Sequence, residues 1–451
     1  MGTYINIKNG LDIRLVGEAE NVIRELPMPE TFAIKPPDFI DLTPKLLVKE
    51  GDEVQAGTPL FYNKIREEVK FCSPVSGEVI GIVRGEKRQI LEVKVLADKE
   101  ITYLPFTSAH PADLSREAIV TALLNSGLWP FIRQRPYGII AHPDDIPKAI
   151  FISAFDSHPL APDYNFLMQG TDEDFQSGVD ALRKLTKGAV HLTLTKEQNA
   201  TVFTKAKGVE FHTVSGPHPA GNVGVHIHRI DPINKGEVVW HMNPQDVLMV
   251  GRLFNRGVFD ATRIVALTGA QVKRPGYYKT LVGHPVHPLL ADAGLKEGAN
   301  RVISGNVLTG KQISDNGYLN FYEAQVTVIP EGNEPEFMGW LAPGLNKFSM
   351  SRAFFSWLSP RKKYNLNSNM HGEERPFVIT GQYEQVFPMD IYPVQLLKAV
   401  LIEDIELMEE LGIYEVVEED FALCEFVCTS KIEAQDIIRR GLDIVRKEMG
   451  A

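Results

Sequence analysis

The sequence predicts a multi-domain protein built from α/β and β units. Its 451 residues correspond to roughly three or four domains, at ~100 to 200 residues per domain. Short apolar-alternating segments, separated by Gly and Pro turns, predict a β unit between Val48 and Val83. Helical segments that alternate with apolar runs between Ala112 and Val258 predict an α/β layer with a mostly parallel sheet.

The composition is that of an ordinary globular protein, with 44% hydrophobic and 23% charged residues. A net charge of -11 argues against nucleic-acid binding, which depends on Lys and Arg. Three cysteines cannot form a disulfide framework, and the N-terminus has no charged segment followed by an apolar one, so we expect a cytosolic compartment. No run approaches the roughly 18 apolar residues of a membrane span, and we expect a soluble or peripheral protein.

The β unit resembles the lipoyl/biotinyl-type barrel-sandwich domain. The two halves of that motif match Gly51–Leu60 and Ser73–Val79. Lipoyl domains carry a modified lysine a fixed distance before the second half of the motif, and counting back without gaps places that position on Arg66. The guanidinium of Arg66 is not a nucleophile that could form the amide bond of the modification. We therefore expect a structural barrel with a solvated, mixed-charge hairpin at Lys64 to Lys70. A gap in the match would leave Lys64 or Lys70 as the modified residue.

Two further units follow in the chain. The α/β unit is expected to contain helices at 115–124, 173–187 and 244–254, and strands at 149–154 and 188–194. The next unit opens on a strand at Thr262 and has a helix near Pro288–Ala293. It resembles the soluble-ligand-binding β-grasp domain, with the opening pattern at Gly269, Val272, Pro275 and Gly276.

The C-terminal region is predicted to be mainly helical. Apolar residues at helical spacing run from Leu396 to Met408, and a second helix is expected over Ile432–Met449. Part of this region keeps the spacing C-x2-C-x2-C-x3-C of an iron-sulfur run, but its first two positions carry no thiolate. The four positions are Glu418, Phe421, Cys424 and Cys428, and upstream the same spacing falls on Phe377, Thr380, Tyr383 and Phe387. Neither run can hold a cluster unaided, and buried packing is the alternative interpretation for the cysteines.

Taken together, the order of units and four longer phrases resemble the family of A subunits of sodium-translocating NADH:quinone reductases. Related architectures are the C subunit of the Rnf complex and the flavin-bearing subunit of complex I. The phrases are INIKNGLDI (5–13), SGLWPFIRQRP (126–136), GPHPAGNVGVHIH (216–228) and TGQYEQVFPMDIYP (380–393).

The resemblance implies five regions. These are an N-terminal barrel-sandwich domain (1–110), a Rossmann-like α/β domain (111–258), a β-grasp ligand-binding domain (259–332), a connector (333–375) and a C-terminal helical, ferredoxin-like domain lacking clusters (376–451). It also implies a peripheral subunit on the cytoplasmic face of the inner membrane, in an oxidoreductase that reduces quinone and exports sodium. Its partners would be the other subunits, chiefly a membrane subunit, which carry the flavins and iron-sulfur centres.

No cofactor is expected in this chain itself. In the complex I relative, glycines bring backbone amides close to the flavin phosphate. Without gaps, those glycines fall here on Pro130, Ile132, Arg133 and Arg135, whose side chains would fill the flavin's space. We therefore expect quinone as substrate, but no bound flavin, nicotinamide or cluster, and we identify no catalytic residue.

A quinone site needs apolar walls and one or two donors for the ring oxygens. The candidates are Trp129, Phe131 and Tyr137 for stacking, with Arg133 or Arg135 as donor. An equally open alternative is that the arginines pair with carboxylates and the aromatic side chains fill the core.

The remaining candidates concern metals and docking. Five histidines are considered as metal ligands: His142, His158, His218, His226 and His228. The last three are expected on a strand and loop without thiolate or acidic neighbours. We therefore expect solvated or packing histidines and no zinc site. The segment 348–363 combines aromatic and basic side chains, which suits docking on a membrane surface or a partner subunit. The alternative is a connector helix that covers the protein's own core. The docking candidates in the segment are Arg352, Phe354, Phe355, Trp357, Arg361, Lys362 and Lys363.

Two other functions stay open from sequence. One is a free-standing soluble protein that binds a small molecule with its β-grasp and Rossmann-type domains. The other is an enzyme with its own flavin, which a visible absorption spectrum would reveal.

Overall fold

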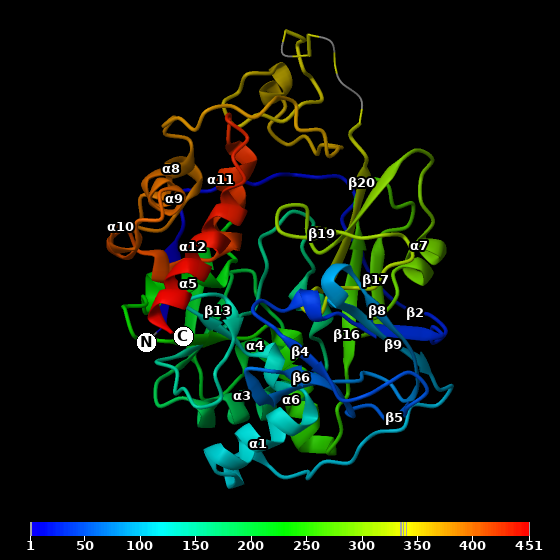
Figure 1. Cartoon of the computed structure of the whole chain (residues 1–451). Helices are drawn as coiled ribbons and strands as arrows, with labels where there is room; N and C mark the ends of the chain where they lie inside the picture. Colours follow the sequence, from blue (N-terminus) through cyan, green and yellow to red (C-terminus); the bar gives the residue numbers. More distant parts are fainter. Residues whose placement is uncertain (1, 334–335, 337, 340, 451) are drawn as a thin grey trace.

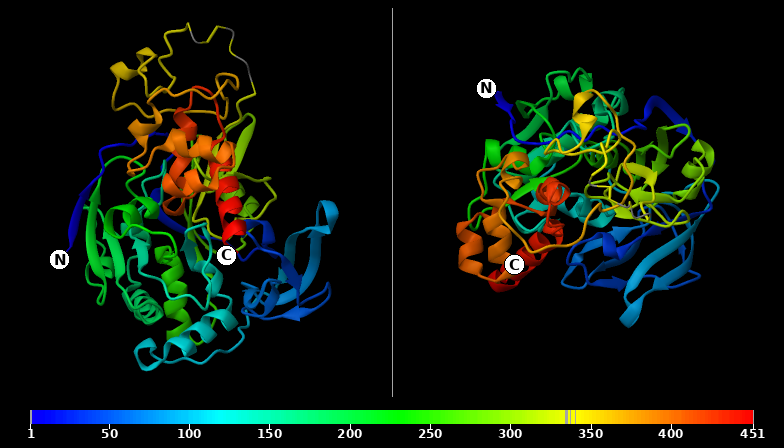
Figure 2. Two further views of the ribbon diagram at one scale, coloured as in Figure 1. Left: turned by 60° about the vertical axis from the view of Figure 1, so that its left-hand side comes forward. Right: turned by 90° about the horizontal axis from the view of Figure 1, so that it is seen from above.

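The computed structural model describes residues 2–333, 336, 338–339 and 341–450. Within these residues, four sheets and a C-terminal group of helices pack around shared cores (Figure 1). Figure 2 shows the N-terminal β unit on one side of the molecule and the C-terminal helices above the α/β unit. In the described part of the chain, no helix has both the length and the apolar character needed to cross a bilayer.

The α/β unit is built on a seven-stranded, mostly parallel sheet. In spatial order its strands are β1 (Thr3–Asn6), β14 (Glu210–Ser215), β13 (Val190–Leu194), β12 (Ile150–Ser153), β15 (Val239–His241), β10 (Arg133–Arg135) and β11 (Ile139–Ile140). Its helices are α1 (Arg116–Ser126), α2 (Tyr164–Leu167), α3 (Asp172–Leu185), α4 (Thr201–Thr204), α5 (Val223–Ile230) and α6 (Pro244–Arg256). The expected helices and strands of this unit are confirmed.

The placement of two histidines on a strand and loop was wrong. His226 and His228 lie on α5, with His226 in its buried face. Their spacing of two looked like a strand pattern. The helix instead begins after Asn222, and its buried residues include Val225 and Ile227.

The N-terminal β unit consists of two small antiparallel sheets, as expected for a barrel-sandwich. One contains β3 (Thr31–Ile34), β9 (Ile90–Ala97), β8 (Gly77–Arg84) and β5 (Glu53–Val54), and the other contains β4 (Pro44–Leu46), β6 (Pro59–Asn63) and β7 (Arg66–Cys72). The hairpin β6–β7 has the expected turn at Lys64. The chain before Thr31 does not join these sheets: β1 pairs with β14, and β2 (Glu20–Glu25) pairs with β17 of the next unit.

A mixed six-stranded sheet forms the third unit, covered by α7 (His287–Ala293) near the expected position. Its strands in spatial order are β19 (Lys311–Gln312), β18 (Asn300–Ser304), β20 (Gln325–Pro330), β16 (Thr262–Thr268), β17 (Gly276–Leu281) and β2.

The C-terminal unit is helical, as expected, but its first long helix is divided. Its helices are α8 (Tyr383–Val386), α9 (Pro393–Leu401), α10 (Ile405–Glu410), α11 (Ala422–Val427) and α12 (Ala434–Met449). The apolar spacing from Leu396 to Met408 suggested one continuous helix. The chain instead breaks at Glu403, which has φ +58°, and the Asp404 side chain caps α10 by accepting from Leu407 N at 3.1 Å.

Apolar cores cross the boundaries between units. One cluster joins Phe71 of the β unit, Trp129 of the α/β unit and Phe321 before β20. A second joins Ile13 and Leu15 of the N-terminal segment to the C-terminal helices. Since burying these side chains requires two units at once, the packing fixes the units against one another.

Candidate functional site

The sheet of the α/β unit has a switch in strand order next to β12. The chain runs from β12 outward through β13 and β14, whereas β15 pairs with the other edge of β12. In open α/β sheets, ligands bind outside the carboxyl ends of the strands at such a switch. The loop that follows β12 is therefore a candidate site, and the loop that follows β14 contacts it.

Polar side chains from these two loops meet at this edge. The Ser157 hydroxyl lies 3.0 Å from His218 Nδ1 and accepts from Gly221 N at 2.8 Å. His158 Nδ1 lies 2.6 Å from Asp156 Oδ1, and the two histidine rings are 4.5 Å apart. The Nε2 atoms of His158 and His218 are buried and have no hydrogen-bond partner among the described residues.

The two histidines differ in charge. Burial lowers the pKa of His158, but the adjacent Asp156 carboxylate outweighs burial, so the net shift of its pKa is upward. For Asp156, burial raises the pKa and His158 lowers it, with a net downward shift. Burial holds the pKa of His218 well below its ordinary value. The environment therefore favours the charged form of His158 and the neutral form of His218.

A partly buried carboxyl group from the third unit joins this edge. Burial raises the pKa of Glu323, just before β20, to about 7, against the opposing charges of Arg133, His158 and Arg263. Its carboxylate has no hydrogen bond or ion pair with any described residue. The Arg133 guanidinium stands 5.1 Å from the ring centre of Tyr322, the residue before Glu323. A carboxyl group that titrates near neutral pH is suited to exchange a proton.

The C-terminal unit completes the arrangement through a buried ion pair. Arg135 is 0% exposed and donates to Asp420 Oδ2 at 2.6 Å and to Glu419 Oε1 at 2.7 Å. Burial raises the pKa of Glu419, whereas the positive charges of Arg135, Arg133 and His158 lower it. The lowering is the larger effect, so the net shift of the pKa is downward. Glu419 therefore contacts Arg135 of the buried ion pair and also interacts electrostatically with Arg133 and His158. We call Arg133, Asp156, His158, Glu323 and Glu419 the junction cluster, because they come from three units.

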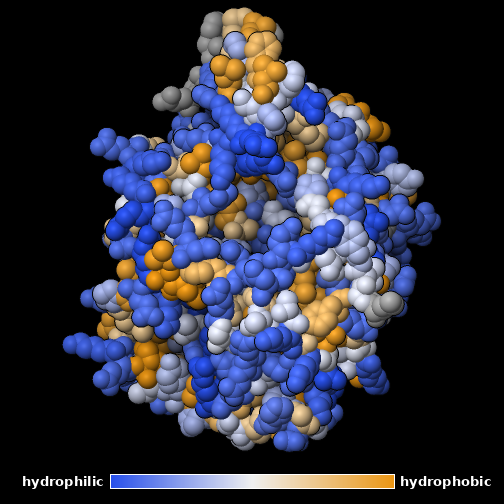
Figure 3. Space-filling view, turned by 180° about the vertical axis from the view of Figure 1, so that it is seen from behind, coloured by the Kyte–Doolittle hydropathy of each residue, from blue (hydrophilic) through white to orange (hydrophobic). Residues whose placement is uncertain are grey.

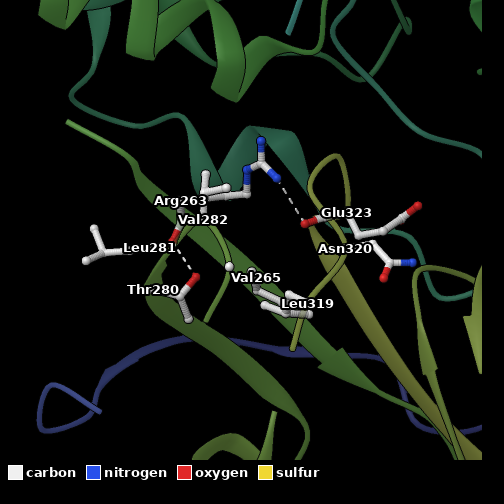
Figure 4. A pocket seen from close by; sticks show the side chains of 9 residues that line it. Arg263, Val265, Thr280, Leu281, Val282, Leu319, Asn320 and Glu323 are labelled. Atoms are coloured by element: carbon white, nitrogen blue, oxygen red, sulfur yellow. Dashed lines mark hydrogen bonds between the residues drawn. The ribbon is translucent and has the colours of Figure 1, made fainter. Parts of the chain in front are cut away.

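A narrow pocket lies beside Glu323 within the third unit (Figure 4). The guanidinium of Arg263 crosses toward the Glu323 backbone carbonyl, to which Nη1 donates at 3.2 Å. Arg263 is itself buried and ion-paired with Asp246 at 2.6 Å. The pocket is otherwise lined by Val265, Thr280, Leu281, Val282, Gly283, Leu319 and Asn320.

Comparison with known proteins places the chain in a family. Three domain models match: "NqrA N-terminal barrel-sandwich hybrid domain" (residues 5–98), "NqrA second alpha/beta domain" (114–259) and "NQRA C-terminal domain" (264–315). The A subunit of the Na(+)-translocating NADH-quinone reductase of Yersinia pestis bv. Antiqua (strain Angola) is 40% identical over 447 residues, covering 98% of this chain and 100% of that protein. The chain belongs to the family of Na(+)-translocating NADH-quinone reductase A subunits.

Other relatives agree over the same length. The A subunits of the Na(+)-translocating NADH-quinone reductases of Pasteurella multocida (strain Pm70) and Alcanivorax borkumensis (strain ATCC 700651 / DSM 11573 / NCIMB 13689 / SK2) are 39% and 37% identical, each over 98% of this chain and 100% of that protein. Among solved structures, the air-oxidized NAD+-reducing [NiFe]-hydrogenase matches with a TM-score of 0.39 and 12% identity, covering 75% of this chain and 62% of that chain. A match this weak supports no conclusion.

Within this family member, the structure separates the five residues predicted to bind quinone. Trp129 and Phe131 are buried: the Trp129 indole donates to Ala141 O at 2.7 Å, and Phe131 stacks on Phe321 at 4.3 Å. Tyr137 is also buried, against Tyr414.

The two arginines occupy different positions. Arg135 pairs with carboxylates, as in the alternative interpretation, whereas Arg133 is partly exposed at the junction cluster. Of the five residues, only Arg133 is placed to meet a ligand without first leaving the core.

Sequence reasoning missed the acidic members of the junction cluster. Asp156 lies in the loop that follows an apolar strand, and the rule for carboxyl ends of parallel strands could have singled it out. Glu323 and Glu419 carry no local signal, because they reach the cluster only through the packing of other units.

The predicted docking segment is largely exposed. It contains a short 3-10 helix, Phe355–Leu358, and not a continuous amphipathic helix. Phe355 is 57% exposed and Trp357 49% exposed, and Leu341, Leu345 and Leu358 are exposed around them. Figure 3 shows apolar side chains gathered at this end of the molecule. Phe354 packs over Gly344, while Lys362 donates to Leu345 O at 2.6 Å and Lys363 pairs with Glu18 at 2.7 Å.

Proposed function

We propose that this chain is the peripheral A subunit of a sodium-translocating NADH:quinone oxidoreductase, on the cytoplasmic face of the inner membrane. Matches of 37–40% identity over almost the whole length of proteins with that name carry the proposal. The electron-carrying flavins and iron-sulfur centres lie in partner subunits. This chain contributes to the quinone end of the reaction, in which quinone takes up two electrons and two protons and becomes quinol.

We also propose the finer fold assignments. The switch of strand order supports a Rossmann-like α/β unit, and the six-stranded sheet with its covering helix α7 supports a ligand-binding β-grasp unit. In the C-terminal unit, Cys424 and Cys428 are buried within its apolar core, which fits a ferredoxin-like frame that holds no cluster.

The quinone site that we propose is the junction cluster. A quinone is polar only at its ring oxygens, so it needs few donors in a mostly apolar setting. Arg133 offers N–H donors, and His158 presents a buried Nε2 that lacks a partner among the described residues. Glu323 is about half protonated near pH 7 and can donate a proton to a reduced ring oxygen. Asp156 orients His158 and raises its pKa, which favours the charged ring.

Docking on the membrane subunit is assigned to the exposed end around Phe355 and Trp357. Aromatic and Arg side chains are enriched at protein interfaces, and two large exposed aromatics in a short helix are suited to anchor a partner. Arg352 and Arg361 are exposed beside them.

Quinone binding to the full-length chain tests the site. Calorimetric titration with a short-chain ubiquinone should give a measurable affinity for the wild-type chain. Arg133→Ala, His158→Gln and Glu323→Gln should each weaken this affinity about tenfold or more, which corresponds to the loss of ~1.4 kcal/mol of hydrogen bonding. Arg361→Ala, which removes an exposed arginine far along the chain, should leave it unchanged. Equal affinities for all four variants would move the quinone site to a partner subunit.

Purification tests the subunit role separately. If the proposal holds, the chain isolated from its own membranes co-migrates with the other subunits, and Phe355→Ser with Trp357→Ser releases it. A stable chain that is absent from membranes would instead support a free-standing small-molecule-binding protein.

A further inference from the structure

Two histidines and a glutamate meet on one face of the α/β sheet, in a place that the junction cluster does not use. His191 lies on β13, and Glu210 and His212 lie on the neighbouring β14. His191 and Glu210 are directly paired in the parallel register. His212 is two residues further along β14 and therefore points to the same face as Glu210. The pairing of these strands thus brings His191 next to two side chains from a separate part of the chain.

The ligand atoms of these three side chains have the spacing of a metal site. His191 Nδ1 lies 2.9 Å from His212 Nε2 and 3.8 Å from Glu210 Oε2. All three atoms lie within 4.8 Å of one another. Two ligands of a tetrahedral zinc ion, each ~2.0–2.1 Å from the metal, are roughly 3.3 Å apart. The two measured separations lie on either side of that value, so small side-chain rotations would place an ion between them.

The setting also favours binding. Both histidines are buried, and Phe151, 4.5 Å from His191 between ring centres, helps to fix its imidazole. The facing nitrogens hydrogen-bond to each other, and the ring that donates presents a lone pair there once its proton moves to its other nitrogen. The Glu210 side chain is 64% exposed, which leaves the site open to solvent on one side.

We propose that His191, Glu210 and His212 form a binding site for a divalent transition-metal ion of the zinc class. Two imidazoles and one carboxylate are the donor set that zinc accepts, and nickel, cobalt and copper also take imidazole ligands. Three protein ligands leave one coordination position for water, so the ion is exchangeable. When bound, it joins β13 to β14 and stabilises this part of the sheet. This site is independent of the proposed quinone function.

Metal titration of the full-length chain, without a polyhistidine tag and stripped by a chelator, tests the site. Zn²⁺ added in competition with a chromophoric chelator should bind at one equivalent, and Co²⁺ should give the visible absorption of a tetrahedral N,O site. His191→Asn and His212→Asn should each weaken binding by about 100-fold or more, since even outer partners of a ligand are worth ~10–100-fold. Zn²⁺ should raise the melting temperature of the wild type but not of these variants.

Two further variants keep the test decisive. Glu210→Gln changes an exposed side chain, so it tests the site without disturbing the core, and it should weaken binding about tenfold. His110→Asn removes an exposed histidine outside the site and should change nothing. If the wild type binds no Zn²⁺, or if Glu210→Gln and His212→Asn bind as tightly as His110→Asn, the three residues form a hydrogen-bonded pair and a surface carboxylate, not a metal site.

Discussion

Glu323→Gln is expected to change how the stability of the protein depends on pH. Burial raises the pKa of Glu323 from its ordinary 4.5 to about 7 in the folded chain. The folded state therefore holds a proton that the unfolded state has lost between these two pH values, and stability falls as pH rises through that window. At ~1.4 kcal/mol for each pKa unit the loss is about 3 kcal/mol, and partial exposure of the side chain reduces it toward ~2 kcal/mol.

The glutamine variant has no such loss, because its amide does not titrate. The difference in unfolding free energy between variant and wild type should therefore grow by ~2–3 kcal/mol in favour of the variant from about pH 5 to about pH 8. Urea unfolding followed by tryptophan fluorescence measures it, since Trp129 and Trp240 are buried 5.5 Å apart in the adjoining α/β unit.

Comparing two proteins at each pH cancels the titration of groups that they share. Glu297→Gln, which removes an exposed carboxyl from the same unit, is the matched control and should follow the wild type. If Glu323→Gln and Glu297→Gln differ by less than ~0.5 kcal/mol at every pH, the Glu323 carboxyl is solvated and cannot act as a proton donor near neutral pH.

Two further predictions concern contacts that hold the units together. Arg135→Met should destabilise the chain by ~3–5 kcal/mol in urea unfolding, because Asp420 is left buried without its ion-pair partner. The control Arg440→Met breaks an exposed ion pair and should cost less than ~1 kcal/mol. Similar losses for the two variants would contradict a buried ion pair at Arg135. Gly251→Ala should lower stability by ~1–3 kcal/mol, because the new Cβ would clash with Asp174 O where α6 packs on α3. The control Gly81→Ala adds a Cβ that meets no atom within 4 Å, and its stability should stay within ~1 kcal/mol of the wild type. Equal melting temperatures for the two variants would rule out the tight contact between α6 and α3.

Much of the fold followed from local pattern alone. The strand at Ile150–Ser153 is mostly apolar, the strand at Val190–Leu194 has apolar residues at alternate positions, and the helices α3 and α6 have one apolar face, so sequence predicted these elements. The division of the helix at Glu403 was missed, because apolar spacing continues through it and only the cap at Asp404 marks the break.

The sequence by itself determined the order of the units, the family and the family's expected role, since these depend on phrases and turns that lie close together in the chain. Only the tertiary structure decided which groups share a site. Glu323, His158 and Glu419 come from three units, and His191 meets His212 only through strand pairing. Side-chain proximity across units is set by packing of the shared cores, and no local pattern of residues encodes it.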